Sequence, residues 1–449
     1  MSAPPLYPRD VVDAVKRAVP LSVVAARYTT LRPSGGALLG LCPLHEERTP
    51  SFRVDDGRAM FKCFGCSRGG DHFTLLQEVE GLPFRDALRQ LAQLGGVDLP
   101  DSPGRAPEGP EGRRRRALAA AARHYHRALA TAPEAARARV YLRRRGFGPH
   151  VLRAFAVGFA PRSEGQPVGS PLADAAAGAG VALDALAEAG LVRESRRRPG
   201  AFYDVFRGRI VFPVLDPVRG DVLGLAGRRL DGVGEGLPDP KRAGPKYLNT
   251  SERAGFRKGD ALFGLYQARR AVFASGEAVL VEGYTDVLAL HQAGVTNTVA
   301  AGGTAFTAAQ AAALRRLAER VLVVYDADAG GENGALAAVR TALTAGLRPR
   351  VAELPEGEDP ASYLARSAEV ADARTALDAR AVDAVAYVYE AVRAGRETVE
   401  GHLEAVRAVI DALAGVGDPL AREAYTQRAA EVSGMRVEAL EAALEPVHP

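Results

Sequence analysis

Two short pairs of potential metal ligands stand out near the start of the chain. Cys42 and His45 are separated by two residues, and so are Cys63 and Cys66. The chain has 3 cysteines, and all of them fall in these two pairs. Thiolate and imidazole ligands at this spacing are typical of a four-coordinate structural zinc site. We therefore predict one structural zinc ion held by all four side chains, with no open position for chemistry.

Other interpretations of this region stay open. His72 could compete as a ligand, although its offset from Cys66 fits the pattern less well. The three cysteines could also be buried free thiols beside an incidental histidine, which their concentration in this spacing disfavours. Aromatic and basic residues alternate here, so the surface could stack bases and meet phosphates, or the rings could simply fill a small core. These residues are Phe52, Arg53, Phe61, Lys62, Phe64 and Arg68.

A second group of chemistry-bearing residues is acidic, and its members follow short apolar runs. Glu282 ends the run EAVLVEG, and Asp326 and Asp328 end the run VLVVYDAD. Asp359 follows PRVAELPEGE, and Asp286 lies one helical turn after Glu282 if a helix begins near residue 284. In an open parallel sheet, ligands bind beyond the carboxyl ends of the strands. We therefore expect these acids to converge on one crevice.

Carboxylates that share a crevice repel one another unless cations neutralise them. Ligand sets made only of oxygen atoms favour Mg²⁺ or Mn²⁺. Two such ions can activate an attacking hydroxyl and stabilise a leaving oxygen in phosphoryl transfer. For Asp286 taken alone, a helix cap or a turn is the simpler interpretation.

The elements that must position these acids alternate between strand and helix. Short apolar strand patterns and helical patterns follow one another from 277 to 355, which predicts a parallel sheet covered by helices on both faces. The preceding segment looks mixed α and β, with a strand pair joined by a turn at 216–220. The segment from 361 onward is rich in alanine and is expected to be helical throughout.

The fold class predicted from these patterns is multidomain α+β and α/β. A stretch dense in proline and glycine, PDSPGRAPEGPEG, marks a linker. We place the boundaries as a zinc-binding domain at 1–99, a linker at 100–116, a basic mixed half at 117–270, a parallel-sheet domain at 271–360 and a helical end at 361–449.

Composition and charge limit the classes of protein to which the chain can belong. The chain has 449 residues, of which 47% are hydrophobic and 25% charged, and its formal net charge is +4. It shows neither a signal-peptide pattern nor an apolar stretch of membrane-spanning length, so we expect a cytoplasmic protein with no membrane partner. Basic runs lie apart from the acids, as in an enzyme that grips a polyanion, although any single run could be solvated surface. These runs cover 113–116, 137–145, 193–198 and 228–258.

From the zinc pairs to about residue 360, the chain resembles the DnaG-type bacterial DNA primase family. CPLH with CFGC, followed by EERTPSF, looks like the family's zinc-ribbon domain, and YLRRRGFGPHVLRAFAVGFAP looks like the start of its RNA polymerase core. RGRIVFP, PKYLN and LFGLY resemble its basic template-binding half. EGYTD and DAD resemble the Toprim fold, which some topoisomerases and nucleases share. The Toprim pattern alone gives only the superfamily, whereas the zinc pairs and the basic half together indicate primase.

The resemblance implies a DNA-dependent RNA polymerase that makes short RNA primers on single-stranded DNA from ribonucleoside triphosphates during replication. Glu282, Asp326 and Asp328 would bind two Mg²⁺ or Mn²⁺ ions, while Asp286 and Asp359 would support that catalytic site electrostatically. The phosphates of template or incoming nucleotide would be held by Arg145, Arg209 and Lys246.

Two features depart from the family pattern. Ala361 follows Asp359-Pro360 where the family usually has a second acid, so a direct metal role for this third acidic motif stays open. The family commonly carries a further C-terminal helical domain that binds the replicative helicase. The chain stops at Pro449, so we expect that domain to be absent, as in a truncated or naturally short form. The helicase therefore stays an open partner.

Two rival functions remain on the sequence alone. One is another Toprim enzyme, a topoisomerase or nuclease, although no segment suggests the DNA-gate domain and active tyrosine that a topoisomerase needs. The other is a zinc-dependent DNA-binding repair mediator that keeps the sheet without the chemistry.

Overall fold

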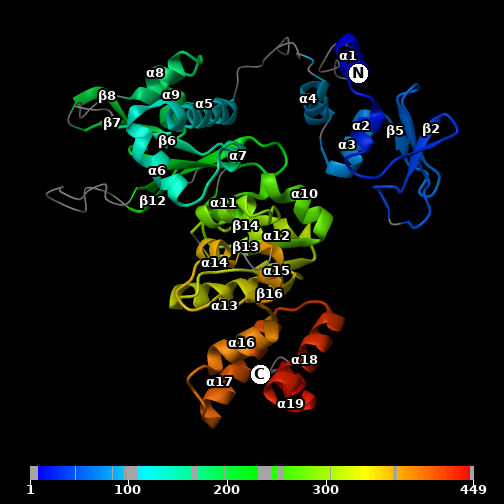
Figure 1. Ribbon diagram of the computed structural model, residues 1–449, viewed down its shortest axis with the longest axis vertical. Coiled ribbons are helices and arrows are strands. Elements are labelled where there is room, and N and C mark those ends of the chain that lie inside the picture. Colours follow the sequence, from blue (N-terminus) through cyan, green and yellow to red (C-terminus); the bar gives the residue numbers. More distant parts are fainter. Residues whose placement is uncertain are drawn as a thin grey trace. The chain divides into compact units, whose positions relative to one another are not determined.

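The computed structural model describes residues 9–45, 47–82, 84–95, 97, 109–162, 170–196, 198–230, 245–250, 257–303, 305–367 and 372–444. The chain folds as two compact units, Met1–Gly109 and Pro110–Pro449 (Figure 1). Most of the predicted linker, 100–108, lies outside the described residues. Its last part, 110–116, is helical instead. Pro110 begins that helix because the first turn needs no N–H donor from its residues.

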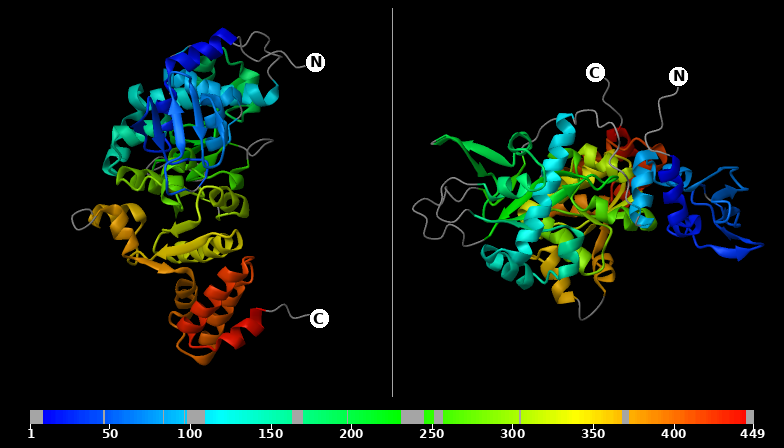
Figure 2. Two further views of the ribbon diagram at one scale, coloured as in Figure 1. Left: turned by 90° about the vertical axis from the view of Figure 1, so that its right-hand side faces the viewer. Right: turned by 90° about the horizontal axis from the view of Figure 1, so that it is seen from above.

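The first unit contains an antiparallel sheet, drawn in blue in Figure 2. Its five strands have the order β1-β2-β3-β4-β5. In β3, Phe52 and Val54 are buried and Arg53 between them is exposed, which is the alternation of a half-buried strand. The strands are β1 (Arg32–Ser34), β2 (Ala37–Gly40), β3 (Phe52–Asp55), β4 (Met60–Cys63) and β5 (Gly69–Gly70).

Four helices complete the first unit, and their apolar faces share one core with the sheet. The third helix begins where the Asp71 carboxylate accepts from the N–H groups of Phe73 and Thr74, and it ends at Gly81, whose φ of 67° suits a left-handed cap. The helices are α1 (Arg9–Ala18), α2 (Leu21–Ala25), α3 (His72–Glu80) and α4 (Phe84–Gly95).

The second unit begins with a four-stranded antiparallel sheet in the order β12-β10-β9-β6. Its central pair is joined at the predicted turn, where Asp216 Oδ1 accepts from the N–H groups of Val218 and Arg219. A separate hairpin and five helices surround it. The strands are β6 (Gly158–Ala160), β7 (Val192–Ser195), β8 (Arg198–Asp204), β9 (Arg209–Leu215), β10 (Val222–Arg229) and β12 (Tyr247–Asn249). The helices are α5 (Pro110–Thr131), α6 (Ala136–Arg144), α7 (Pro149–Ala154), α8 (Pro171–Ala177) and α9 (Leu183–Glu188).

The predicted parallel sheet is present, in the order β14-β13-β15-β16-β17. Its first four strands are parallel, whereas β17 adds an antiparallel edge. The prediction that 361–449 is entirely helical is wrong at this strand, because its three residues are too few to show a period of two. The strands are β13 (Glu277–Val281), β14 (Thr298–Ala300), β15 (Arg320–Val323), β16 (Arg348–Ala352) and β17 (Ala381–Asp383).

Helices cover both faces of this sheet, as its apolar strands require. Successive residues of β13 enter different cores: Leu280 packs in one cluster, and Val279 and Val281 in the other. The clusters draw on helices from opposite sides of the strands. These helices are α10 (Leu265–Ser275), α11 (Tyr284–Gln292), α12 (Ala308–Arg315), α13 (Ala329–Thr344), α14 (Pro360–Ser367) and α15 (Ala373–Asp378).

Four helices follow the sheet and extend one of its two cores. Buried side chains of α16 and α17 pack in the same cluster as α13. Within the described residues, no helix combines the length and apolar character that crossing a membrane requires. The four helices are α16 (Ala384–Arg393), α17 (Val399–Leu413), α18 (Pro419–Ser433) and α19 (Val437–Leu444).

The interior position of β13, between β14 and β15, predicts a large effect for one truncation. Leu280 is fully buried there, whereas Leu420 on α18 is 76% exposed. Leu280→Ala should lower the free energy of unfolding by about 2–5 kcal/mol, because it leaves a cavity in a closely packed core. Leu420→Ala should change it by less than about 0.5 kcal/mol. Chemical denaturation followed by circular dichroism measures both, and equal effects would contradict this placement of the core.

Candidate functional site

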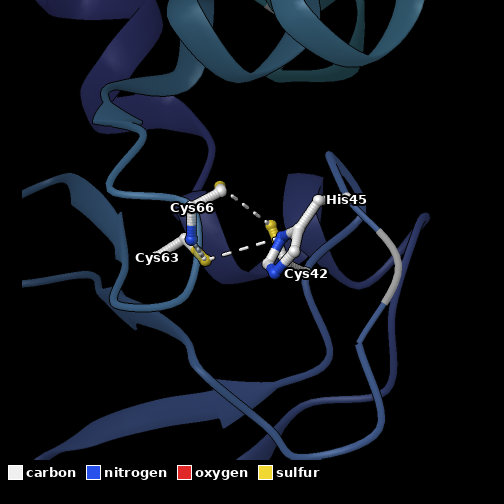
Figure 3. Close-up of side chains that lie close together, drawn as sticks. All are labelled: Cys42, His45, Cys63 and Cys66. Atoms are coloured by element: carbon white, nitrogen blue, oxygen red, sulfur yellow. Dashed lines mark hydrogen bonds between the residues drawn. The ribbon is translucent and has the colours of Figure 1, made fainter.

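The four predicted zinc ligands lie together in the first unit. Their ligand atoms all fall within 4.8 Å of one another. Cys42 Sγ lies 4.0 Å from Cys66 Sγ, and Cys63 Sγ lies 3.9 Å from His45 Nδ1 (Figure 3). His72 is not part of this group, since its Nε2 atom lies 2.7 Å from the carbonyl oxygen of Val19.

Each ligand pair sits on a tight loop that points sulfur inward. The N–H of Leu44 donates to Cys42 Sγ at 3.4 Å, and the N–H of Cys66 donates to Cys63 Sγ at 3.3 Å. Such bonds orient thiolates, and the donor set of three sulfurs and one imidazole nitrogen suits tetrahedral zinc. The residues present therefore fit the metal predicted from their spacing.

The aromatic residues near the zinc pairs divide between core and surface. Phe52 and Phe61 are buried, with ring centroids 5.2 Å apart. Phe64 is 67% exposed between two zinc ligands, and Lys62 on β4 is also exposed. The core interpretation thus holds for the first two rings, while Phe64 stays available to stack on a base.

The principal acids follow two neighbouring strands of the parallel sheet. Glu282 comes directly after β13, and Asp326 and Asp328 come shortly after β15. These strands are paired in parallel, so their carboxyl ends meet at one edge. The chain runs from β13 to β14 on one side and then to β15 on the other, which makes this edge the place where strand order reverses.

The directions of the pKa shifts indicate that these carboxylates lie within range of one another's charge. Burial raises the pKa of Glu282, and the neighbouring charges of Asp326 and Asp328 raise it further. Burial also raises the pKa of Asp326, with additional contributions from Asp359 and Asp328. Both shifts mean that the ionised forms are disfavoured here, as expected for like charges in a partly desolvated crevice.

Three of the predicted acids also shape the backbone. Asp286 Oδ2 accepts from the N–H of Gly283 at 3.1 Å, so the cap interpretation of that residue holds at the start of α11. Asp328 Oδ1 caps α13 by accepting from the N–H of Gly331 at 2.8 Å. Asp359 Oδ1 accepts from the N–H of Ser362 at 2.7 Å at the start of α14. Each cap uses one carboxylate oxygen.

Asp286 is the most deeply buried of these acids. Burial, followed by the charges of Asp326 and Asp359, raises its pKa to about 7. It therefore lies close enough to the other acids to feel their charge. A buried carboxyl in this state can act on the site through hydrogen bonding and electrostatics.

The crevice contains carboxylate oxygens that no protein group satisfies. Glu282 Oε1 and Asp326 Oδ1 are buried and have no hydrogen-bond partner. Buried oxygens of this kind are expected where a ligand completes the site, and an all-oxygen set fits a hard divalent cation. The acids are less tightly gathered than the zinc ligands: among the described residues, the Cys/His set is the only group of three or more candidate ligands placed closely enough to hold one ion.

Gly331 is a feature of this crevice that sequence reasoning missed. A Cβ atom at this position would lie 2.0 Å from the carbonyl oxygen of Asp326 and 3.0 Å from Glu282 Oε1. The first turn of α13 therefore approaches the acids more closely than any residue with a side chain would allow. The only signal in the sequence is the glycine pair after DADA.

Two of the three predicted phosphate-binding residues lie near the acids. Arg145 Nη1 is 3.8 Å from Asp359 Oδ2. The charges of Lys246 and Arg145 both lower the pKa of Asp326, against the larger opposing effect of burial. Lys246 is exposed, so its ammonium group is accessible to a ligand.

Arg209 has different surroundings from the other two. It is 5% exposed, and its Nη1 donates to the carbonyl oxygens of Gly227 at 3.0 Å and Lys246 at 3.2 Å. Its Nη2 donates to the carbonyl oxygen of Pro245 at 2.8 Å. These contacts fix the backbone that carries Lys246, so the geometry favours a positioning role over direct phosphate contact.

Tyr141 was also missed as a member of this region. The guanidinium of Arg145 lies 5.7 Å from the centre of its ring, and that of Arg228 lies 4.6 Å away. The ring thus contacts two cations through its face. The YLRRRG motif contained the residue, but the partner from β10 is distant in sequence and could not be inferred.

The turn at Gly302 and Gly303 lies beside the acids. The N–H of Gly303 points to the carbonyl oxygen of Glu282 at 3.4 Å, and the Tyr284 hydroxyl donates to the carbonyl oxygen of Gly302 at 3.2 Å. The turn is therefore tied to the strand end that carries Glu282. Thr304, the next residue of the chain, lies outside the described residues.

Family comparisons match four successive segments. Residues 7–106 match the CHC2 zinc finger, 124–269 match the DNA primase catalytic core, N-terminal domain, and 279–364 match the Toprim-like family. Residues 386–438 match the DnaB-helicase binding domain of primase. The expectation that no helicase-binding domain is present is therefore wrong. An Ala-rich helical pattern does not distinguish this domain from the end of a core.

Whole-chain comparisons agree. The DNA primase of Deinococcus radiodurans is 38% identical over 423 residues, which covers 93% of this chain and 69% of the relative. The zinc-binding and RNA polymerase domains of Aquifex aeolicus primase superpose with a TM-score of 0.63 at 29% identity, covering 98% of this chain and 99% of that one. A DnaG primase catalytic domain bound to ssDNA gives a TM-score of 0.57 at 29% identity, covering 72% and 99%. The chain spans 57%, 69% and 53% of the length of three curated DNA primases that it matches.

The zinc cluster predicts the metal content of the protein. Elemental analysis should find about one zinc per chain, because the four ligands complete a single tetrahedral shell. Cys63→Ser should lose most of that zinc, whereas Ser67→Ala, in the same loop but outside the ligand set, should retain it. A purified protein with full secondary structure and no zinc would contradict the site.

Proposed function

Because this chain belongs to the bacterial DNA primase family, we propose that it is a DNA-dependent RNA polymerase that makes short RNA primers on single-stranded DNA. The observation that carries the proposal is the crevice at the ends of β13 and β15, where Glu282 and Asp326 present buried, unpartnered carboxylate oxygens. The family matches also include a zinc finger and the N-terminal domain of the primase catalytic core. The rival Toprim enzymes need neither, so both matches favour primase over them.

In the proposed reaction, the 3′-hydroxyl oxygen of one ribonucleotide attacks the α-phosphorus of the next nucleoside triphosphate. The new O–P bond replaces the bond to pyrophosphate, and the hydroxyl proton passes to solvent. Glu282, Asp326 and Asp328 would hold two Mg²⁺ or Mn²⁺ ions at this point. The bound ions would lower the pKa of the hydroxyl and neutralise charge on the leaving group.

The remaining residues orient these groups. The caps made by Asp328 and Asp286 fix the first turns of α13 and α11, so the carboxylates cannot swing away from the strand ends. No side chain needs to act as a general base. The charge of Asp359 acts on Asp326 in the same crevice. Ala361 stands after Pro360, where the family usually has a second acid.

Positive charge beside the acids would receive the phosphates of template and nucleotide. Lys246 is exposed, and so is Arg145, whose guanidinium lies near the Asp359 carboxylate and the ring of Tyr141. Arg209 would hold the Lys246 backbone in place through the carbonyl oxygens of Pro245 and Lys246. The solved primase domain bound to ssDNA supports a single-stranded template as the polyanion.

The helices α16 to α18 would supply a partner surface. They make up most of the segment that matches the DnaB-helicase binding domain of primase, 386–438, which ends at the start of α19. The replicative helicase is therefore the proposed protein partner. Binding there would bring primer synthesis to the strand that the helicase exposes.

The direct test is incorporation of labelled ribonucleotides on single-stranded DNA with magnesium and no supplied primer. Asp326→Ala should reduce synthesis by more than roughly 100-fold, since even an outer partner of a metal ligand can be worth that much. DNA binding should change little. Asp411→Ala, which removes an exposed acid of α17, should behave as wild type.

The same assay separates the rivals. Strand cleavage by the wild-type chain would favour a topoisomerase or nuclease, and DNA binding without any turnover would favour a repair mediator. Normal primer yield from Asp326→Ala would remove that residue from the catalytic site.

The exposed Lys246 predicts a salt effect. Lys246→Ala should weaken binding of template and reduce the slope of log affinity against log salt by about 0.7, the value for one lost phosphate contact on a single strand. Arg436→Ala, an exposed cation beside α19, should leave the slope unchanged. An unaltered slope for Lys246→Ala would place that side chain away from the bound nucleic acid.

A further inference from the structure

Glu47 is a carboxylate outside the predicted ligand set that contacts both members of the first ligand pair. Its Oε1 atom accepts from the N–H of Cys42 at 2.7 Å. Its Oε2 atom lies 3.3 Å from His45 Nε2. One side chain therefore fixes the backbone of the cysteine and the ring of the histidine at once.

Ser51 extends these contacts to the second ligand pair. Its hydroxyl donates to Glu47 Oε2, and its N–H donates to Glu47 Oε1 at 3.2 Å. The same hydroxyl oxygen lies 3.1 Å from Cys63 Sγ and accepts from the N–H of Gly65 at 3.1 Å. Glu47 and Ser51 together thus reach three of the four ligands through direct contacts.

Gly65 packs closely against the same side chains of His45, Ser51 and Glu47. A Cβ atom there would lie 2.8 Å from His45 Nε2, 2.9 Å from Ser51 Oγ and 3.0 Å from Glu47 Oε2. The glycine is therefore required for the approach of its loop to the histidine and the carboxylate. This packing is independent of the hydrogen bonds and converges on the same atoms.

The orientation of His45 explains what these contacts achieve. Its Nδ1 atom faces Cys63 Sγ (Figure 3). Its Nε2 atom faces Glu47 Oε2. A histidine that binds metal through one nitrogen commonly donates its other N–H to a carboxylate, which fixes the tautomer and the ring plane. A surface ion pair would need none of the contacts to Cys42, Ser51 or Gly65.

We infer that Glu47 and Ser51 form an outer shell that positions His45, Cys42 and Cys63 for zinc. In this arrangement Glu47 receives the Nε2–H of His45, so that Nδ1 is the metal-binding nitrogen. Ser51 links Glu47 to the Cys63 loop through its contacts with Cys63 Sγ and the N–H of Gly65. The inference concerns metal retention in the first unit and does not depend on polymerase activity.

The test measures zinc transfer from the full-length, zinc-loaded protein to a chromogenic chelator. Glu47→Gln should release zinc roughly 10–100-fold faster, because the amide keeps the shape but cannot accept from both His45 and Ser51. Ser51→Ala should also release it faster. Glu78→Gln is the matched control, since Glu78 pairs with Arg68 and contacts no ligand.

A second measurement distinguishes positioning from general instability. Cobalt(II) replaces the zinc, and its visible absorption reports the geometry of the ligands. Glu47→Gln and Gly65→Ala should both shift the cobalt spectrum while circular dichroism shows the wild-type helix and strand content. Zinc release and cobalt spectra that match wild type in Glu47→Gln would overturn the inference. If Cys63→Ser loses zinc while Glu47→Gln and Ser51→Ala retain it as wild type does, the ligand set stands and the outer shell is refuted.

Discussion

Like charge held at the ends of two adjacent strands is the constraint on which the catalytic half depends. Glu282 and Asp326 are partly desolvated, and burial raises the pKa of each. Neighbouring charge raises both further: that of Asp326 acts on Glu282, and those of Asp359 and Asp328 act on Asp326. Protein groups alone do not relieve this repulsion, because one oxygen of each acid has no partner. Cations bound in the crevice would relieve it. The basic residues Arg145 and Lys246 already act in that direction.

The rest of the second unit holds this unfavourable arrangement in place. The strands β13 and β15 are buried on both faces, so their ends cannot separate without exposing two cores. The cap that Asp328 makes on α13 fixes this acid after β15. Gly331 lets the first turn of α13 approach Asp326 and Glu282 without a steric clash. Packing of the folded sheet thus stabilises an arrangement of acids that their mutual repulsion disfavours. The zinc unit follows a similar logic, with outer contacts that orient the metal ligands.

Much of this organisation was predictable because it follows from short-range patterns. Ligand spacing predicted the zinc cluster, and the alternation of apolar runs with helical segments predicted the parallel sheet and the strand ends that carry the acids. The three-residue strand β17 was missed because it is too short to show periodicity. Arg209 was expected to contact phosphate, since the sequence gives its charge but not the carbonyl oxygens that surround it. The stacking of Arg228 on Tyr141 and the close approach of Gly331 depend on distant segments, so no local pattern reveals them.

The proposed polymerase requires that the acidic crevice bind divalent ions. Anomalous diffraction from crystals of the protein soaked in manganese would detect this binding. We expect manganese peaks coordinated by Glu282, Asp326 and Asp328, with the unpartnered oxygens Glu282 Oε1 and Asp326 Oδ1 among the ligands. Manganese bound elsewhere, or an empty crevice at concentrations that support primer synthesis, would contradict it.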